Sequence, residues 1–201
     1  NNILTCVDNT FASPYLQNPL DLGADIVLPI RKVSVKGGSG GGETVMVGVF
    51  IRPHLISTLK DLAKKYELIM MSSSGKEVTN KIVDYLEKDG QIFSFRLSRE
   101  SCYLTDLQLF VKDLRVINRP LDSMLLVDDC TYSFGFQLDN GVPIIPFTGS
   151  KEDAELLLLG PYLDWCMQAV DVRQPNRSQF KFHLYRECSS VDEVLKKLFP
   201  K

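Results

Sequence analysis

Short apolar runs that end in polar clusters recur along this chain, and segments with a helical pattern separate them. Three such runs are Ile3 to Val7, Tyr66 to Met71 and Ser123 to Val127. Their length and their apolar character are typical of buried strands. Strands that alternate with helices form βαβ units around a mostly parallel sheet. The sequence therefore predicts an α/β fold with helices on both faces of a parallel sheet.

The remaining elements fit the same alternation. Further strands are predicted at Ile26 to Val35, Val45 to Ile51, Ile92 to Leu97 and Val142 to Pro146. The predicted helices are Pro53 to Lys65, Lys76 to Leu86, Glu152 to Ala169, which Gly160-Pro161 can interrupt, and Val191 to Leu198. The glycine-rich stretch 36–43 is expected to be a flexible hairpin tip or linker, since it lacks the Lys-Ser/Thr ending of a P-loop. We expect residues 1–201 to form a single domain.

Charge and hydropathy exclude several classes of protein. The formal net charge of −2 argues against broad electrostatic binding to nucleic acid or anionic lipid. The longest apolar run, Leu156 to Leu159, is too short to span a membrane. The sequence does not begin with methionine, so we treat it as a segment that can belong to a longer chain. The five cysteines include no Cys-x-x-Cys pair, which argues against a zinc site or a disulfide framework.

Polar residues follow three of the predicted strands. They are Cys6 to Thr10, Ser72 with Ser73, and Asp128 with Asp129. Ligands of parallel sheets bind beyond the carboxyl ends of the strands. If these strands are neighbours, the three clusters form one site.

Each candidate residue has a functional and a structural interpretation. Asp128 and Asp129 can hold Mg²⁺, or they can cap the next helix. Ser72 or Ser73 can bind a phosphoryl oxygen, or the serines can simply begin a helix whose N–H groups bind anions.

Three further residues have the same two interpretations. Lys112 can neutralise phosphate, although most lysines are solvated on the surface. Asp8 can act as a general acid/base, or it can cap a loop. Cys6 can be a nucleophile, but no arginine occurs in 7–30 to complete a Cys-x5-Arg phosphate loop, and we expect an inert thiol. The other four cysteines are expected to be buried free thiols, and His54 and His183 structural residues.

Several stretches resemble one family in order and spacing. They are Ala24 to Pro29, Ile51 to His54, Arg99 to Cys102, Val111 to Leu114 and Leu125 to Asp129. The chain resembles the phosphatase domain shared by the small RNA-polymerase C-terminal-domain phosphatases and the presequence-receptor subunit of the mitochondrial inner-membrane translocase. Both belong to the haloacid-dehalogenase superfamily. The resemblance implies a Rossmann-like, mostly parallel sheet with a small β-hairpin insertion.

The resemblance also implies roles for the site residues. Active members end their first strand in Asp-x-Asp-x-Thr, where the first Asp attacks phosphorus and helps to hold Mg²⁺. Asp8 and Thr10 match this motif, and Cys6 takes the place of the nucleophile. By the same resemblance Ser72 binds phosphate, Lys112 stabilises the phospho-aspartate, and Asp128 with Asp129 holds the metal.

The cysteine changes the expected function. A neutral thiol removes an oxygen nucleophile and a carboxylate from the metal shell, and hard Mg²⁺ disfavours sulfur. We therefore predict a pseudophosphatase that binds a protein or peptide, or serves as a scaffold in a larger mitochondrial complex. The segment 138–143, the turn 147–149 and the stretch 170–173 favour the translocase branch and hence the mitochondrion. The alternative is a Mg²⁺-dependent protein Ser/Thr phosphatase of the nucleus or cytoplasm.

Overall fold

The computed structural model describes residues 51–189, the three strands β1 (Ile3–Cys6), β2 (Val33–Ser34) and β3 (Val45–Met46), and residues Glu193 and Lys197. β2 and β3 pair antiparallel on either side of the glycine-rich stretch. That stretch itself, 36–43, lies outside the described residues, as do Asp8 and Thr10. So does most of the helix expected at Val191 to Leu198, of which Glu193 and Lys197 are helical.

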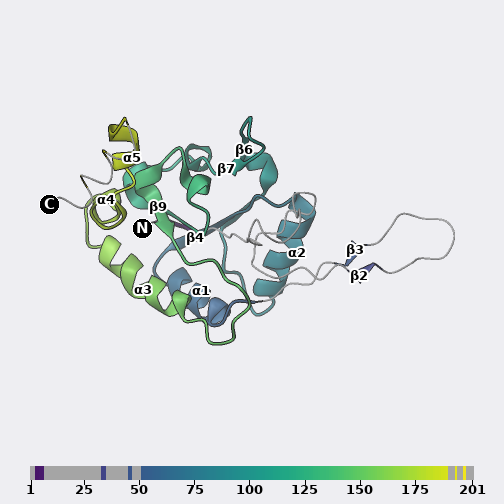
Figure 1. Cartoon of the computed structure of the whole chain (residues 1–201). Coiled ribbons are helices and arrows are strands. Elements are labelled where there is room, and N and C mark those ends of the chain that lie inside the picture. Colours follow the sequence, from purple (N-terminus) through teal and green to yellow (C-terminus); the bar gives the residue numbers. More distant parts are fainter. Residues whose placement is uncertain are drawn as a thin grey trace.

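A five-stranded parallel sheet forms the centre of the structure (Figure 1). The strand order is β5 (Phe95–Leu97), β4 (Glu67–Met71), β1, β8 (Met124–Asp128) and β9 (Gly141–Pro143). From β1 the chain runs outward to β4 and β5, and it then returns to β8 and β9 on the other side of β1. The strand order therefore reverses between β1 and β8, which is where α/β sheets bind ligands.

Three helices cover one face of the sheet: the amphipathic helices α1 (Leu55–Ala63) and α2 (Lys76–Leu86), and the largely apolar helix α3 (Glu155–Cys166). α1 and α3 pack side by side (Figure 1). Their apolar side chains join those of β4, β8 and β9 in one core, which includes Leu59, Leu62, Leu68, Met70, Ile82, Val83, Leu125, Val127, Leu159 and Leu163. The apolar periodicity in the sequence predicted α1 and α2, because it marks the side of the helix that is removed from water.

Short 3-10 segments cover the other face. Leu114 of η2 (Leu114–Ile117) and Phe134 of η4 (Thr131–Phe134) are fully buried there against Met71 and Leu126. The predicted α/β architecture is therefore confirmed, with 3-10 turns packed against the sheet on this second face. A small hairpin of β6 (Tyr103–Leu104) and β7 (Phe110–Val111) projects on the same side of the sheet as these turns (Figure 1).

Several element boundaries differ from those predicted. The strand expected from Ile92 begins only at Phe95, because the Ile92 and Phe93 N–H groups donate to Glu87 Oε1 at 2.8 and 2.7 Å. α3 runs through Gly160-Pro161 without a break. Pro161 is exposed, so water can reach the carbonyl that its missing N–H leaves free.

The sequence pattern missed the C-terminal helices α4 (Arg173–Phe180) and α5 (Leu184–Glu187). α4 has a largely polar sequence and is held partly through Asn176, whose side-chain amide donates to the carbonyl oxygens of Asp139 and Gly141 at 3.1 and 3.0 Å. Among the described residues, no helix has the length and apolar character needed to cross a bilayer.

Candidate functional site

The carboxyl ends of β4, β1 and β8 lie next to one another in the sheet. Cys6, the last residue of β1, pairs with Val127, so Asp128 lies one position further along β8. Ser72 directly follows β4 on the other side of β1. The backbone therefore brings the ends of the three predicted clusters to one edge of the sheet. The side chain of Cys6 lies outside the described residues.

Lys112 and Asp128 form a buried ion pair at this edge. The Lys112 ammonium Nζ donates to Asp128 Oδ2 at 2.9 Å, and the two side chains are 1% and 0% exposed. Lys112 follows β7, and its backbone N–H donates to the carbonyl of Ser133 in η4 at 2.8 Å. The hairpin thus carries the lysine from a distant part of the sequence to the aspartate. The alternative of a solvated surface lysine is wrong.

The second oxygen of Asp128 holds the turn that follows the strand. Asp128 Oδ1 accepts the backbone N–H of Cys130 at 2.7 Å. Burial raises the pKa of Asp128, and the Lys112 ammonium and the Cys130 N–H both oppose that rise. The carboxylate therefore orders the loop next to it, but it does not cap the 3-10 turn η4, whose N-cap residue is Cys130.

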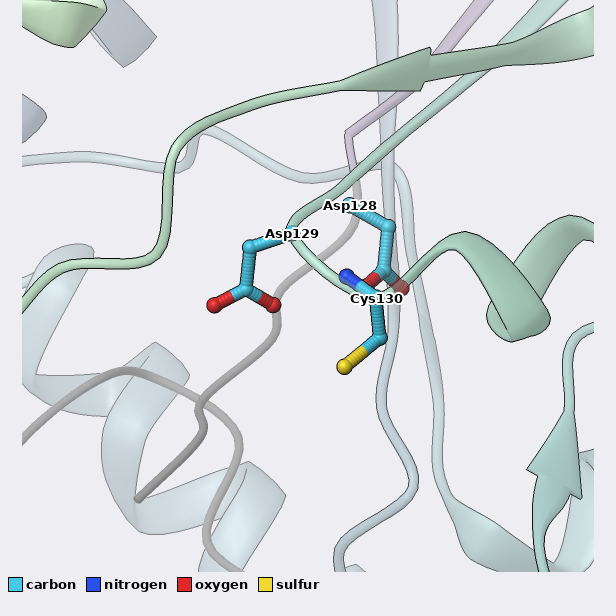
Figure 2. A group of neighbouring side chains, drawn as sticks. All are labelled: Asp128, Asp129 and Cys130. Carbon is cyan, nitrogen blue, oxygen red and sulfur yellow. The ribbon is translucent and has the colours of Figure 1, made fainter. Parts of the chain in front are cut away.

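The carboxylate of Asp129 differs from that of Asp128 in its hydrogen bonding. Both of its oxygens are buried, and among the described residues neither accepts a hydrogen bond from another residue. Burial, and then the Asp128 carboxylate, raises the pKa of Asp129 to about 7, although Lys112 and Arg52 pull in the opposite direction. Figure 2 shows that the side chains of Asp128, Asp129 and Cys130 project to the same side of the strand end. Buried carboxylates in proteins are usually paired with another group or coordinate a metal.

The two aspartates fit the magnesium ion that the family implies. Mg²⁺ is usually bound by one or two carboxylates, with water and phosphate oxygens completing its shell. Among the described residues, no other residue donates a hydrogen bond to the buried oxygens of Asp129, and Asp128 lies directly beside it. When bound, the ion would supply positive charge against a phosphoryl group.

The serine loop after β4 is held by local hydrogen bonds. Ser72 Oγ accepts the N–H of Ser74 at 3.0 Å, and the Ser72 N–H donates to the carbonyl of Leu97 at 2.8 Å. Arg99 Nε donates to the Ser73 carbonyl at 2.6 Å, while its guanidinium lies 4.9 Å from the centre of the Phe110 ring. These contacts fix the loop where α2 begins. Phosphate binding by Ser72 or Ser73 stays a prediction.

Sequence reasoning gave no role to Arg52, which is buried near the site. Its guanidinium forms a bidentate pair with Asp153, with Nε–Oδ1 and Nη2–Oδ2 distances of 2.7 and 2.8 Å. The guanidinium also packs against the ring of Phe147 and lowers the pKa of Asp129 through its charge. The only sequence signal was its place in the stretch Ile51 to His54, because periodicity does not tell a buried arginine from an exposed one.

The cysteines differ from the expectation of uniformly buried thiols. Cys166 is buried, whereas Cys102, Cys130 and Cys188 are half-buried, and none of these four forms a disulfide. Burial and the neighbouring carboxylates of Asp129 and Asp128 raise the pKa of the Cys130 thiol to about 12. This cysteine, directly after the aspartate pair, is the second site residue to which the sequence gave no role.

Comparison with known proteins identifies the family. Residues 6–173 match the model of the NLI interacting factor-like phosphatase family. The chain belongs to this family. CTD small phosphatase-like protein 3 of Caenorhabditis elegans is 36% identical over 146 residues, which are 73% of this chain and 47% of that protein. Nuclear envelope morphology protein 1 of Schizosaccharomyces pombe is 31% identical over 133 residues, which are 66% of this chain and 28% of the relative.

A human relative and a solved structure agree with this assignment. The carboxy-terminal domain RNA polymerase II polypeptide A small phosphatase 1 of Homo sapiens is 30% identical over 156 residues, which are 76% of this chain and 56% of that protein. The chain thus spans between a quarter and about half of the length of these relatives. The fission yeast RNA polymerase II CTD phosphatase Fcp1 has a TM-score of 0.51 at 16% identity, covering 98% of this chain and 61% of that chain, which shows a shared fold.

These findings confirm the haloacid-dehalogenase-type phosphatase domain and its link to the small C-terminal-domain phosphatases. They do not support the preference for the translocase branch, nor the mitochondrial location and complex that followed from it. The relatives named above are phosphatases of the C-terminal-domain type and a nuclear envelope protein.

Proposed function

We propose that this domain carries the Mg²⁺-dependent phosphoprotein site of a C-terminal-domain-type Ser/Thr phosphatase, and that Cys6 holds its turnover far below that of an aspartate-bearing relative. The observation that carries the proposal is the buried Lys112–Asp128 pair beside the carboxylate of Asp129, which accepts no hydrogen bond from another described residue. The three residues lie where the strand order of the sheet reverses.

The buried lysine–aspartate pair supports a functional role for these residues, because such a pair adds little to the stability of the fold. The free energy needed to remove a lysine and an aspartate from water is about as large as the attraction between them. A protein with well-packed apolar residues in place of such a pair is often just as stable. A role in ligand binding or catalysis therefore explains better than stability why a lysine at this end of the sheet is only 1% exposed. Its ammonium can offset the negative charge of a phosphoryl group bound beyond the strand ends.

Cys6 limits that chemistry. The residue ends β1, where it pairs with Val127, the residue directly before Asp128. A thiol lacks the carboxylate oxygen that attacks phosphorus in the family, and it is a poor ligand for a hard cation. The remaining residues can still bind and orient a phosphorylated side chain. The domain should therefore bind phosphoproteins even though it hydrolyses them slowly.

The substrate class follows from the relatives. The human relative is named for the carboxy-terminal domain of RNA polymerase II, which is a protein substrate. By extension, the ligand of this domain is a phosphorylated Ser or Thr residue of a protein in the nucleus or cytoplasm. The formal net charge of −2 agrees with a protein partner and gives no support to nucleic-acid binding.

Phosphate release tests the proposal. The substrates are p-nitrophenyl phosphate and a Ser-phosphorylated peptide with Mg²⁺, and the proteins are wild type, Cys6→Asp, and Cys6→Asp combined with Lys112→Met. We expect Cys6→Asp to exceed wild type by at least about 10³-fold, because loss of a nucleophile removes at least that much. The double variant should fall back toward wild type. Robust wild-type turnover would show an active enzyme and contradict the impairment.

A second candidate, a binding module without catalysis, is favoured by the same cysteine. Titration of wild type with the phosphopeptide, its unphosphorylated form and a basic amphipathic peptide separates the two. Saturable binding of the phosphopeptide alone, with no activity in Cys6→Asp, would indicate a binding module. Saturable binding of the basic peptide alone would instead support a presequence-receptor role.

A further inference from the structure

Strand β5 forms one edge of the central sheet. Among the described strands it pairs only with β4, in parallel, with Phe95 opposite Ile69. The N–H of Ser94, the residue before β5, donates to the carbonyl of Leu68 at 2.8 Å. Because the backbone groups of successive residues in a strand alternate between its two sides, the N–H and C=O of Phe95 point away from β4. This side of β5 can therefore pair with a further strand.

An open groove of about 600 Å³ runs along this edge. It is lined by Asp84 and Glu87 at the C-terminal end of α2, and by Gln91 and residues 93–96 of the segment that leads into β5. Its volume is within the range of about 300–1,000 Å³ that is typical of ligand sites. Because the groove is open and follows the backbone of an edge strand, its shape suits an extended chain.

The charged residues of the groove are held by one another and by the backbone. Glu87 Oε1 accepts the N–H groups of Ile92 and Phe93 at 2.8 and 2.7 Å, and its Oε2 accepts Arg96 Nη2. Arg96 Nη1 donates to Asp84 Oδ1 at 2.6 Å. Two carboxylates thus share one guanidinium, and the Asp84 side chain is 65% exposed. The groove keeps one negative charge that a basic side chain can approach from solvent.

The two faces of the sheet differ in chemistry at β5. Phe95 pairs with Ile69, which belongs to the core on the 3-10 face, so its 53% exposed ring lies on that face. Arg96 pairs with Met70 of the helix-side core, and it extends to the carboxylates at the end of α2. A strand that joined β5 would direct its side chains alternately to these two faces. One set would meet the apolar ring, and the other set would meet the acidic groove.

We propose that the edge of β5 and its groove bind an extended segment of a partner protein in which basic and apolar residues alternate. The segment adds a strand to the sheet through the N–H and C=O of Phe95. Its basic residues face Asp84, and its apolar residues pack beside the ring of Phe95. In this mode of recognition the main-chain hydrogen bonds supply affinity and the alternate side chains supply specificity. The strands β4 and β1 separate β5 from β8, so the inference does not depend on the phosphatase site.

A second copy of this chain suits the edge less well. The charged side chain of β5 is Arg96, which is bound by Asp84 and Glu87 of its own groove. Two β5 edges brought together would therefore juxtapose two grooves of the same negative charge, and like charges repel. Charge complementarity favours a basic segment of another protein.

Fluorescence anisotropy with labelled peptides tests the proposal on the wild-type chain. The probe is a heptapeptide in which valine and lysine alternate, and the control has the same residues in two blocks. At about 0.15 M salt, where exposed charges are largely screened beyond 8 Å, we expect saturable binding of the alternating peptide only. Methylation of its backbone nitrogens should abolish binding, because it removes the hydrogen bonds of an added strand. Equal binding of the two sequences would show unspecific charge attraction, and no binding of either would also overturn the proposal.

Protein variants locate the peptide. Asp84→Lys should weaken binding at least about fivefold, since it replaces an attraction by a repulsion. Glu77→Lys makes the same charge change at the other end of α2, outside the groove, and should leave the affinity unchanged. Equal losses in these two variants, or no loss in Asp84→Lys, would overturn the proposal.

Phe95→Pro tests the strand edge itself. Proline is tolerated on an edge strand where the N–H points away from the sheet, so the variant should fold and still bind at least about fivefold more weakly. Phe95→Val keeps the N–H and should weaken binding less. If Phe95→Pro does not fold, the methylated peptide tests the same hydrogen bonds on the wild-type protein. Sedimentation velocity gives the alternative: a dimer of wild type that Phe95→Val retains and Asp84→Lys strengthens would assign the edge to a second copy and overturn the proposal.

Discussion

Lys112 Nζ and Asp128 Oδ2 lie 2.9 Å apart in the interior, and their side chains are 1% and 0% exposed. Lys112 directly follows the hairpin β6–β7, whereas Asp128 ends strand β8. Their contact joins the hairpin to the sheet at the edge where the strand order reverses. Stability and function are therefore coupled at this pair.

Lys112→Met should destabilise the protein by about 3–5 kcal/mol, because it leaves a buried aspartate without its cation. Denaturant unfolding at neutral pH measures the loss. Combining Lys112→Met with Asp128→Leu should recover most of the stability, since a buried pair can often be replaced by apolar residues. Lys64→Met, which breaks the exposed pair with Asp61, is the control and should change little. A Lys112→Met variant as stable as wild type would contradict this reading.

The Arg52–Asp153 pair should make stability depend on acid. The Arg52 guanidinium lowers the pKa of Asp153, so the folded protein gains stability above the pKa of the unfolded aspartate and loses it as the pH falls through the folded value. Asp153→Asn should cost about 3 kcal/mol at pH 7, where Arg52 is left buried and unpaired. The difference from wild type should shrink toward pH 2 in urea unfolding series. A constant difference at every pH would rule out the ion pair as its cause.

Asp129 should reduce the stability of the metal-free protein at high pH. Its folded pKa of about 7 lies above that of an unfolded aspartate, so the folded state holds an extra proton between roughly pH 4 and 7. Stability must fall as the pH rises through that window. Asp129→Asn should therefore gain about 2 kcal/mol at pH 8 in chelator, and nothing at pH 3. If the variant is less stable at pH 8, the carboxylate has a partner after all.

Two glycines should respond in opposite ways to the same change. A Cβ on Gly141 would lie 2.2 Å from the buried ring of Phe134, so Gly141→Ala should cost about 1–3 kcal/mol through overpacking. A Cβ on Gly160 meets no atom within 4 Å, and the residue lies inside α3, so Gly160→Ala should stabilise by up to about 1 kcal/mol. Thermal unfolding of the two variants measures both. Equal effects of the two substitutions on thermal stability would show that the ring of Phe134 moves aside.

The sequence allowed the sheet and its polar edge to be predicted, while the second face and the C-terminal helices were missed. β4, β8 and α2 lie almost where the apolar runs and the helical period placed them. Local patterns were enough there because these elements bury one face against a common core. The 3-10 turns around Phe134 and the polar helix α4 carry no such period, since a few long-range contacts hold them.

The linear order of residues determined the chemistry available to this protein. It supplied an apolar strand ending in Cys6, an aspartate pair after another strand, and a lysine in between. The tertiary structure decided which of these groups meet. It buried Lys112 against Asp128, and it turned the thiol of Cys130 toward both aspartates. It also left the carboxylate of Asp129 without a hydrogen bond from any other residue that the structure describes. Burial and charge pairing depend on contacts between distant segments, and no local pattern records them.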